Sequence, residues 1–98
     1  MVNVVETTDE SIFQTYKRYP VVLDRGQGCL VWDDKGREYL DFLAGIAVCN
    51  LGHCHPAVVQ AAKEQCDKLM HVSNYFYTGP QAALSELLIS NTFADRIF

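Results

Sequence analysis

The stretch that decides the fold of this 98-residue chain is Trp32-Asp-Asp-Lys-Gly-Arg-Glu-Tyr-Leu-Asp-Phe-Leu-Ala-Gly-Ile-Ala-Val-Cys-Asn-Leu-Gly-His-Cys-His-Pro56. Near its start, Asp34-Lys-Gly36 predicts a tight turn, because glycine tolerates the positive φ that such turns require. At its end, Pro56 predicts the first residue of a helix, where its missing N–H would have had no partner anyway. The stretch therefore predicts a hairpin, an apolar connection and a helix start.

Towards the N-terminus, a further short helix is expected. Thr7 or Thr8 is placed to cap it, and Glu10 stands three residues after Thr7, as in a capping box. The helix would hold Tyr16 and end before Pro20, since the residue before a proline is pushed to extended geometry.

Three strands are expected, at residues 21–25, 29–33 and 38–42. Gly26-Gln-Gly28 would join the first two as a turn. Because a strand follows it, and not a helix N-terminus, the two glycines do not predict a phosphate-binding loop. Short turns between successive strands predict a small antiparallel meander.

Two helices complete the predicted fold. After Pro56, apolar residues recur at a spacing of three to four and form one stripe: Val58, Ala62, Cys66 and Leu69. Thr78-Gly-Pro-Gln81 is a second capping-box pattern and predicts another helix start. The fold class is thus an α+β segment, with residues 1–55 forming the N-terminal helix and small sheet and residues 56–98 forming a helical segment.

Composition and charge exclude several classes of function. The chain is 49% hydrophobic and 20% charged, with a net charge of −4 and no basic patch, so we expect no nucleic-acid partner. It has no apolar run of about 18–20 residues and its N-terminus lacks the pattern of a signal peptide, so we expect no membrane association and a cytoplasmic location. The four cysteines are then expected to be reduced thiols.

The Cys/His cluster at residues 49–55 offers a zinc site as an alternative, with Cys66 and His71 as further ligands. The chain contains no Cys-x-x-Cys pair, and Cys54 stands directly between two histidines. We therefore favour a structural interpretation, in which Cys49 and Cys66 pack as small apolar side chains and His55 caps a helix. No metal ligand is predicted.

The aromatic run Tyr75-Phe-Tyr77 is a candidate contact surface. Three consecutive aromatic side chains cannot all face one core, so at least one is expected to be exposed or to pack against a partner. A loop folded onto its own domain remains the alternative.

Six motifs, in order and at natural spacing, resemble the N-terminal part of the class III (subgroup II) pyridoxal-phosphate aminotransferases. The resemblance runs from about Thr15 to Phe98 and implies the start of a type I aminotransferase fold, an α/β enzyme that acts as a homodimer with pyridoxal phosphate. The motifs are Tyr16-x-x-x-Pro20, Arg25-Gly-x-Gly28, Trp32-Asp-Asp-x-Gly36-x-Glu-Tyr-Leu-Asp41, Ala44-Gly-Ile-Ala-Val48, Gly52-His-x-His-Pro56 and Ser73-Asn-x-x-Tyr-Thr-x-Pro80.

The resemblance also implies roles for particular residues. Tyr16, Ile46 and Ala47 would line the substrate pocket. Relatives that act on other ω-amino substrates tend to place a bulky aromatic at the position of Ile46 and Ala47, whereas Gly45-Ile-Ala-Val48 is similar to the type that acts on N-acetylornithine. The residues implied at the subunit interface are Asn74, Tyr75, Phe76 and Tyr77.

The activity implied is a ping-pong transamination that transfers the ω-amino group of N-acetylornithine to 2-oxoglutarate in arginine biosynthesis. In the family, a lysine holds the cofactor and an aspartate keeps its ring nitrogen protonated. None of Lys17, Lys35, Lys63 and Lys68 matches that lysine. We therefore expect no catalytic or cofactor-binding residue here, and an inactive N-terminal fragment whose parent binds pyridoxal phosphate with its missing part.

Other interpretations stay open at this point. The parent could act on ornithine, succinylornithine or 4-aminobutyrate, or the chain could be a non-catalytic interaction module that keeps an aminotransferase-like surface.

Overall fold

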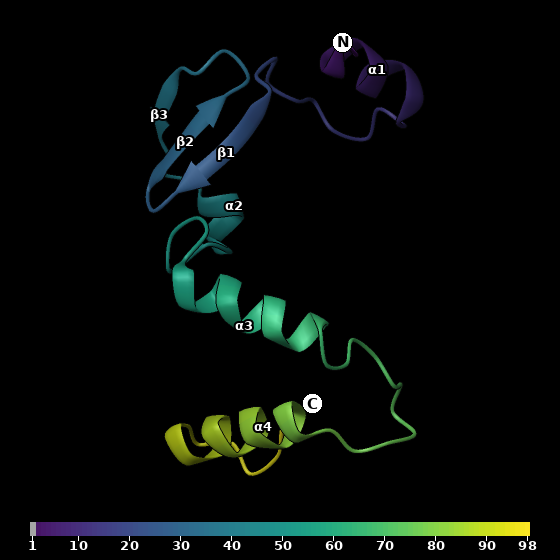
Figure 1. The fold of residues 1–98 in the computed structure, drawn as a ribbon, viewed down its shortest axis with the longest axis vertical. Coiled ribbons are helices and arrows are strands. Elements are labelled where there is room, and N and C mark those ends of the chain that lie inside the picture. The colour runs from purple at the N-terminus through teal and green to yellow at the C-terminus, as the bar shows by residue number, and fades with distance from the viewer. Residues whose placement is uncertain (1) are drawn as a thin grey trace. The chain divides into compact units, whose positions relative to one another are not determined.

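The computed structural model describes residues 2–98. These form two compact units, one reaching Ala62 and the other beginning at Lys63. The predicted order of a helix, a three-stranded antiparallel sheet and further helices is confirmed (Figure 1). The elements are α1 (Val4–Ser11), β1 (Leu23–Gln27), β2 (Leu30–Asp33), β3 (Glu38–Leu40), α2 (Ala44–Ala47), α3 (Pro56–Cys66) and α4 (Gly79–Asn91).

The first helix begins and ends earlier than the sequence predicted, and neither Thr7 nor Thr8 is its cap. Asn3 is the N-cap: its side-chain oxygen accepts the N–H of Glu6 at 3.3 Å, and its amide donates to the Glu6 carboxylate at 3.0 Å. This reciprocal pair satisfies the helix start one turn before the expected capping box. The helix ends at Ser11, so Tyr16 lies in the irregular segment that follows it.

The sheet has the order β1-β2-β3, with both pairs antiparallel. Strand β1 runs two residues further than predicted, through Gly26 and Gln27, so the turn consists of Gly28 and Cys29. Gly28 takes a φ of +57°, which suits glycine because it has no Cβ to clash. The β2–β3 turn is the predicted one, with Gly36 at a φ of +79°.

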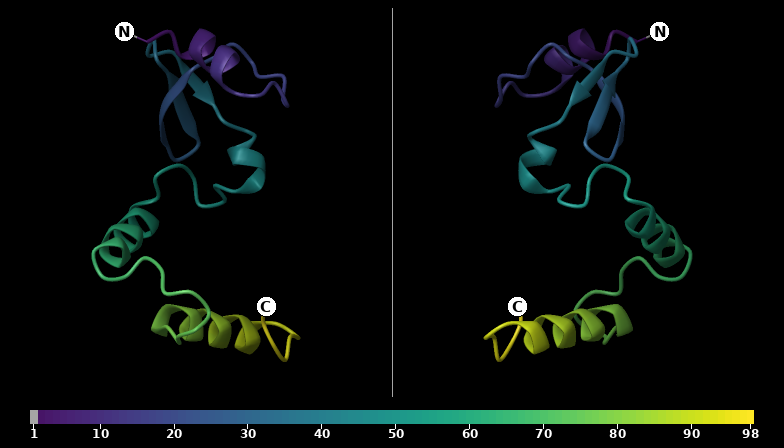
Figure 2. Two further views of the ribbon diagram at one scale, coloured as in Figure 1. Left: turned by 90° about the vertical axis from the view of Figure 1, so that its right-hand side faces the viewer. Right: turned by 90° about the vertical axis from the view of Figure 1, so that its left-hand side faces the viewer.

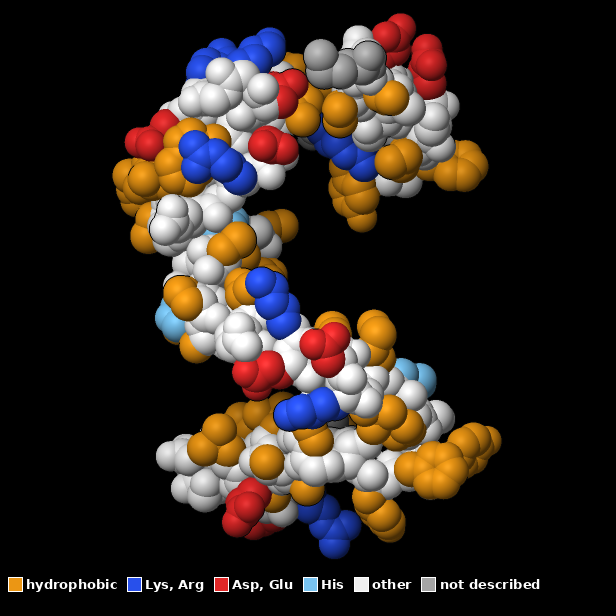
Figure 3. All heavy atoms as spheres, in the orientation of Figure 1, with side chains coloured by type: hydrophobic (Ala, Val, Ile, Leu, Met, Phe, Trp, Pro, Cys, Tyr) orange, Lys and Arg blue, Asp and Glu red, His pale blue; other side chains and the backbone are white. Residues whose placement is uncertain are grey.

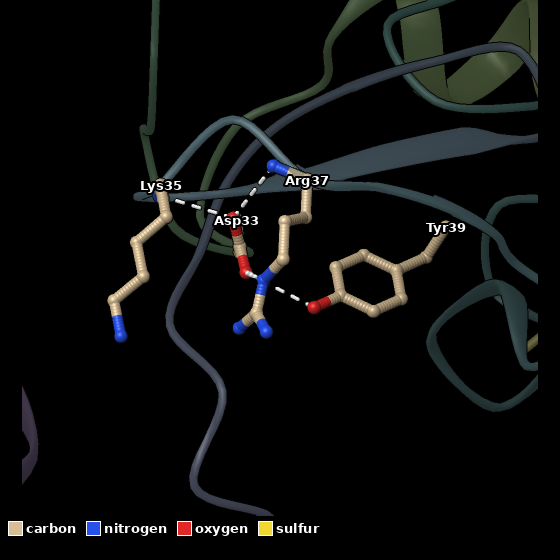
Figure 4. Close-up of polar contacts among 4 residues, drawn as sticks. All are labelled: Asp33, Lys35, Arg37 and Tyr39. Carbon is tan, nitrogen blue, oxygen red and sulfur yellow. Dashed lines mark hydrogen bonds and ion pairs between the residues drawn. The ribbon is translucent and has the colours of Figure 1, made fainter.

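Asp33 holds the β2–β3 turn together (Figure 4). Its side chain accepts the backbone N–H groups of Lys35 at 3.0 Å and Arg37 at 2.8 Å, the Arg37 Nε–H at 2.7 Å and the Tyr39 hydroxyl at 3.0 Å. Asp33 is only 3% exposed, and burial by itself would raise its pKa. The hydrogen bonds from Arg37, Tyr39 and Lys35 outweigh burial and lower the pKa of Asp33 to about 2.

The apolar core of the described residues is very small. Val31, in the central strand, is their one buried hydrophobic side chain. A second contact within the sheet joins the guanidinium of Arg25 to the ring of Trp32, 3.7 Å from its centroid. Exposed hydrophobic side chains are visible over both units (Figure 3). The N-terminal unit therefore depends on strand pairing and polar contacts more than on apolar burial.

The second unit contains α4 and the loop that precedes it. Thr78 is the N-cap of α4, as predicted, but its side chain makes no capping hydrogen bond, so the expected capping box is not formed. Cys66, at the end of α3, is exposed and does not pack as expected. No helix within residues 2–98 is long and apolar enough to span a bilayer.

Acid should weaken the β2–β3 turn. The pKa of Asp33 is about 2 in the folded chain against an ordinary value of 3.8, so below about pH 4 the unfolded chain binds the proton more readily. The stabilisation by Asp33 is complete above that pH and is lost as the pH falls towards about 2. Urea unfolding followed by the fluorescence of Trp32, the single tryptophan, measures this loss.

The matched variants are Asp33→Asn and Asp34→Asn. We expect Asp33→Asn to lower the unfolding midpoint at neutral pH and to flatten its dependence on acid, because the amide cannot form the ion pair with Arg37. Asp34→Asn, an exposed carboxylate in the same turn, should keep the acid dependence of the parent chain. An Asp33→Asn variant with unchanged acid dependence contradicts this account.

Candidate functional site

The segment α2, which carries two of the predicted substrate residues, is a left-handed turn. Its four residues have φ angles of 47° at Ala44, 64° at Gly45, 63° at Ile46 and 60° at Ala47. Hydrogen bonds close the turn, from the Ala47 N–H to the Leu43 carbonyl at 3.0 Å and from the Val48 N–H to the Ala44 carbonyl at 2.8 Å. In Figure 2 it is the short coil directly after the sheet.

This turn is strained, because only one of its four residues is glycine. The left-handed conformation brings Cβ close to the following carbonyl oxygen and costs about 1–2 kcal/mol for each residue that has a Cβ. Such a conformation persists only where the surrounding structure over-determines it, and it is found most often at functional sites. The contacts that hold the turn are therefore the natural place to look for a site.

Asp41 is the first of these contacts. Its Oδ1 accepts the N–H of Leu43 at 2.8 Å and the N–H of Ala44 at 3.0 Å, which are the amides that lead into the turn. Its own N–H donates to the Cys29 carbonyl at 2.8 Å, so its backbone is fixed to the end of the sheet. Asp41 thus joins the sheet to the turn.

His53 holds the same carboxylate from the other side. Its Nε2 lies 2.6 Å from Asp41 Oδ2. Its backbone forms an isolated antiparallel bridge with Gly28: the His53 N–H donates to the Gly28 carbonyl at 2.8 Å, and the Gly28 N–H donates to the His53 carbonyl at 3.0 Å. We call the pair Asp41 and His53 the clasp.

Two glycines make room for the clasp. A Cβ on Gly26 would lie 2.7 Å from His53 Cγ and 2.8 Å from His53 Cβ. A Cβ on Gly52 would lie 2.9 Å from the Cα of Gly28, and Gly52 itself has a φ of +87°. The two glycines of the Arg25-Gly-x-Gly28 motif therefore serve as the surface against which residues 52 and 53 pack.

The clasp also sets the charge of Asp41. The hydrogen bond with His53 is the largest cause that lowers the pKa of Asp41, and the amides of Leu43 and Ala44 lower it further. Burial acts in the opposite direction and does not prevail. The Asp41 carboxylate is therefore ionised at neutral pH and accepts all three hydrogen bonds.

The predicted substrate residues lie on two separate features of the N-terminal unit. Ile46 and Ala47 stand on the left-handed turn, and the Ile46 side chain is 90% exposed. Tyr16 is exposed and borders a cavity of about 290 Å³ between α1 and the segment that follows it. Their role as a substrate pocket stays a prediction.

The predicted interface residues lie in the loop before α4, in the second unit. Asn74 is exposed, and so are the three aromatic side chains that follow it: Tyr75, Phe76 and Tyr77. The expectation that at least one of these aromatics is exposed is confirmed, while their place at a subunit interface stays a prediction.

The Cys/His cluster does not converge on a metal. His53 directs its Nε2 to Asp41, and the four cysteines are free thiols. Over residues 2–98, no group of three or more His, Cys, Asp or Glu side chains could hold a metal ion. The His55 carbonyl accepts the Val59 N–H at 3.0 Å, so His55 contributes to the start of α3 through its backbone.

Comparison with known proteins identifies the family. The profile described as aminotransferase class-III matches residues 12–98. The chain therefore belongs to the class-III aminotransferases, a family that uses pyridoxal phosphate.

Individual relatives agree with this assignment. The chain is 52% identical over 93 residues to the acetylornithine aminotransferase of Nostoc sp., an alignment that covers 95% of this chain and 22% of the relative. The N-acetylornithine aminotransferase structure from Stenotrophomonas maltophilia matches with a TM-score of 0.82 and 45% identity, over 96% of this chain and 24% of that one. The structure of an ornithine aminotransferase from Toxoplasma gondii, with partial occupancy of pyridoxal phosphate, matches with a TM-score of 0.90 and 32% identity. The match covers 95% of this chain and 22% of that one.

The chain thus spans less than a quarter of the length of the relatives it matches. All four lysines are exposed. The two carboxylates with lowered pKa are already engaged, Asp33 by Arg37 and Asp41 by His53.

Sequence reasoning placed Ile46 and Ala47 as site residues through the family resemblance, but it missed the clasp. Asp41 and His53 stand 12 positions apart, at the end of one motif and the start of another, and nothing in their spacing indicates that they meet. The available signal was Gly26 and Gly52, since a residue against which another segment packs closely has no room for a Cβ.

The clasp predicts a steric penalty at Gly26. In Gly26→Ala the new methyl group would overlap the His53 ring, so His53 must shift and the chain should lose about 1–3 kcal/mol of unfolding free energy. Urea unfolding followed by circular dichroism measures the loss.

The matched control is Gly79→Ala, since a Cβ on Gly79 meets no atom within 4 Å. It should leave stability unchanged or raise it slightly, because alanine restricts the unfolded chain. Equal stability of the two alanine variants would show that His53 does not pack on Gly26.

Proposed function

We propose that this chain is the N-terminal segment of an acetylornithine-type aminotransferase and that it forms part of the substrate side of the active site. The observation that carries the proposal is the left-handed turn, which holds Ile46 and Ala47 exposed at the cost of backbone strain. The 52% identity to an acetylornithine aminotransferase supports the choice of substrate.

The side chains on the turn suit a substrate with a bulky end group. Ile46 is aliphatic and Ala47 is small, so the acetyl group of the substrate would meet an apolar wall. This wall has no polar side chain that would lose its water when the acetyl group binds. A tyrosine at position 46 would occupy that space and bring a hydroxyl to it. The turn therefore favours N-acetylornithine over free ornithine, whose charged amine would face an apolar surface.

The reaction proposed for the complete enzyme is transfer of the ω-amino group of N-acetylornithine to 2-oxoglutarate. Pyridoxal phosphate supplies a ring that accepts electrons from the substrate carbon. The lysine and the phosphate-binding groups that hold the cofactor belong, in this proposal, to the part of the parent outside this chain. This segment binds and orients substrate, and it has no activity alone.

The aromatic loop supports a further part of the proposal, assembly into a homodimer. Three adjacent aromatic side chains exposed on one loop form a surface of the type that interfaces bury. We propose that Asn74, Tyr75, Phe76 and Tyr77 contact the second subunit of the parent enzyme.

A direct assay tests the function. The complete enzyme should convert N-acetylornithine and 2-oxoglutarate with a higher kcat/KM than ornithine or 4-aminobutyrate, and the 98-residue chain alone should give no turnover. In the complete enzyme, Ile46→Tyr should lower the preference for N-acetylornithine over ornithine about tenfold, as loss of one well-fitted apolar contact does.

Leu51→Tyr is the control, because Leu51 is an exposed apolar residue outside the turn. It should leave the substrate preference unchanged. An enzyme that prefers ornithine, or an Ile46→Tyr variant that keeps the parental preference, argues against this substrate assignment.

A further inference from the structure

Ile46 and Ala47 cannot hold their own positions by packing. Both are exposed in the described unit, and Ile46 is 90% exposed. The backbone conformation that presents them is intrinsically unfavourable at Ala44, Ile46 and Ala47, which have positive φ angles. A group outside these two side chains must therefore fix where the turn lies relative to the sheet.

The contacts of the turn show which group that is. The Asp41 carboxylate binds the two amides that lead into the turn with one oxygen, at 2.8 and 3.0 Å, and His53 with the other, at 2.6 Å. The N–H groups of Leu43 and Ala44 stand before the four left-handed residues, so these charge-assisted hydrogen bonds do not set the handedness of the turn. They fix where the turn begins and how it is directed relative to the sheet.

His53 in turn has little freedom to move. Its backbone pairs with Gly28 in both directions, and its ring lies against Gly26 with no room for a Cβ between them. Strand β1 therefore fixes the position of His53, His53 fixes the Asp41 carboxylate, and Asp41 fixes the start of the turn. Because these are short, directed contacts to rigid backbone, a small displacement of His53 would move the Asp41 carboxylate.

We propose that Asp41 and His53 are positioning residues, which set the orientation of Ile46 and Ala47 and thereby the substrate preference of the enzyme. The inference rests on the proposed function, and it deepens that function by assigning specificity to two residues that do not touch substrate. They act only through the turn.

The test uses the complete enzyme and three variants: Asp41→Ala, Asp41→Asn and His53→Gln. Asp41→Ala removes every contact, and we expect KM for N-acetylornithine to rise about tenfold or more with a much smaller change in kcat, because misplacement of a substrate contact weakens binding before it affects the chemical step. Asp41→Asn keeps one oxygen for the turn amides, and His53→Gln keeps a donor near the position of Nε2, so both should recover most of the parental KM.

The decisive measurement is the energetic coupling between substitutions at Asp41 and at Ile46. A residue that only stabilised the fold would show no such coupling. If Asp41 acts through the turn, Asp41→Ala should change the ratio of kcat/KM for N-acetylornithine over ornithine in the parent but not in an Ile46→Ala background. Additive effects in the two backgrounds would overturn the proposal. Should Asp41→Ala fail to fold, His53→Ala, which removes the contact with Oδ2 and leaves the turn amides paired, decides the question through the same ratio.

The two failures are distinguishable. A parent enzyme without N-acetylornithine activity overturns the proposed function. An active parent in which Asp41→Ala and His53→Ala lower only the yield or melting temperature, with KM and substrate ratio unchanged, overturns the positioning role alone. Asp24→Asn, which removes an exposed carboxylate on β1, should change neither KM nor the ratio.

Discussion

The hydrogen bonds of the Asp41 carboxylate are the constraint on which the N-terminal unit depends. They connect the end of the sheet, the loop that leads to α3 and the left-handed turn at residues 44–47. Each of these three parts is irregular in conformation, and none buries enough apolar surface to define itself. A single ionised side chain with three fixed partners defines them together.

Polar contacts have this importance because apolar burial is scarce. A fully buried valine contributes about 1.5–3 kcal/mol, and Val31 is the one buried hydrophobic side chain over residues 2–98. Strain in the turn opposes folding by a similar amount at each non-glycine position. The carboxylates of Asp33 and Asp41 are therefore central to the local structure, since each organises a segment that strand pairing alone would leave undefined.

The sequence predicted the regular elements better than the site. Gly36 and Pro56 each occupy a conformation that few other residues allow, so the β2–β3 turn and the start of α3 were predictable from single residues. The start of α1 was predicted wrongly because Asn3-Val-Val-Glu6 and Thr7-Thr-Asp-Glu10 are both capping patterns. Local sequence rules do not indicate which of the two begins the helix. Asn3 begins the helix: its side chain accepts the Glu6 N–H, and its side-chain amide donates to the Glu6 carboxylate.

The turn and the clasp could not have been derived from local pattern for a different reason. Ala-Gly-Ile-Ala carries no local signal for a left-handed turn, since only Gly45 suits a positive φ, and His53, which completes the clasp, stands 12 positions from Asp41. A conformation that departs from the local sequence preference is informative. In natural proteins the local preference of a segment mostly agrees with its conformation in the fold, and the exceptions concentrate at functional positions. Ile46 departs from its local preference in this way: it is a β-branched residue, the type least suited to positive φ, held exposed where glycine would relieve the strain. Stability does not account for isoleucine there, whereas the substrate contact that we propose for Ile46 would.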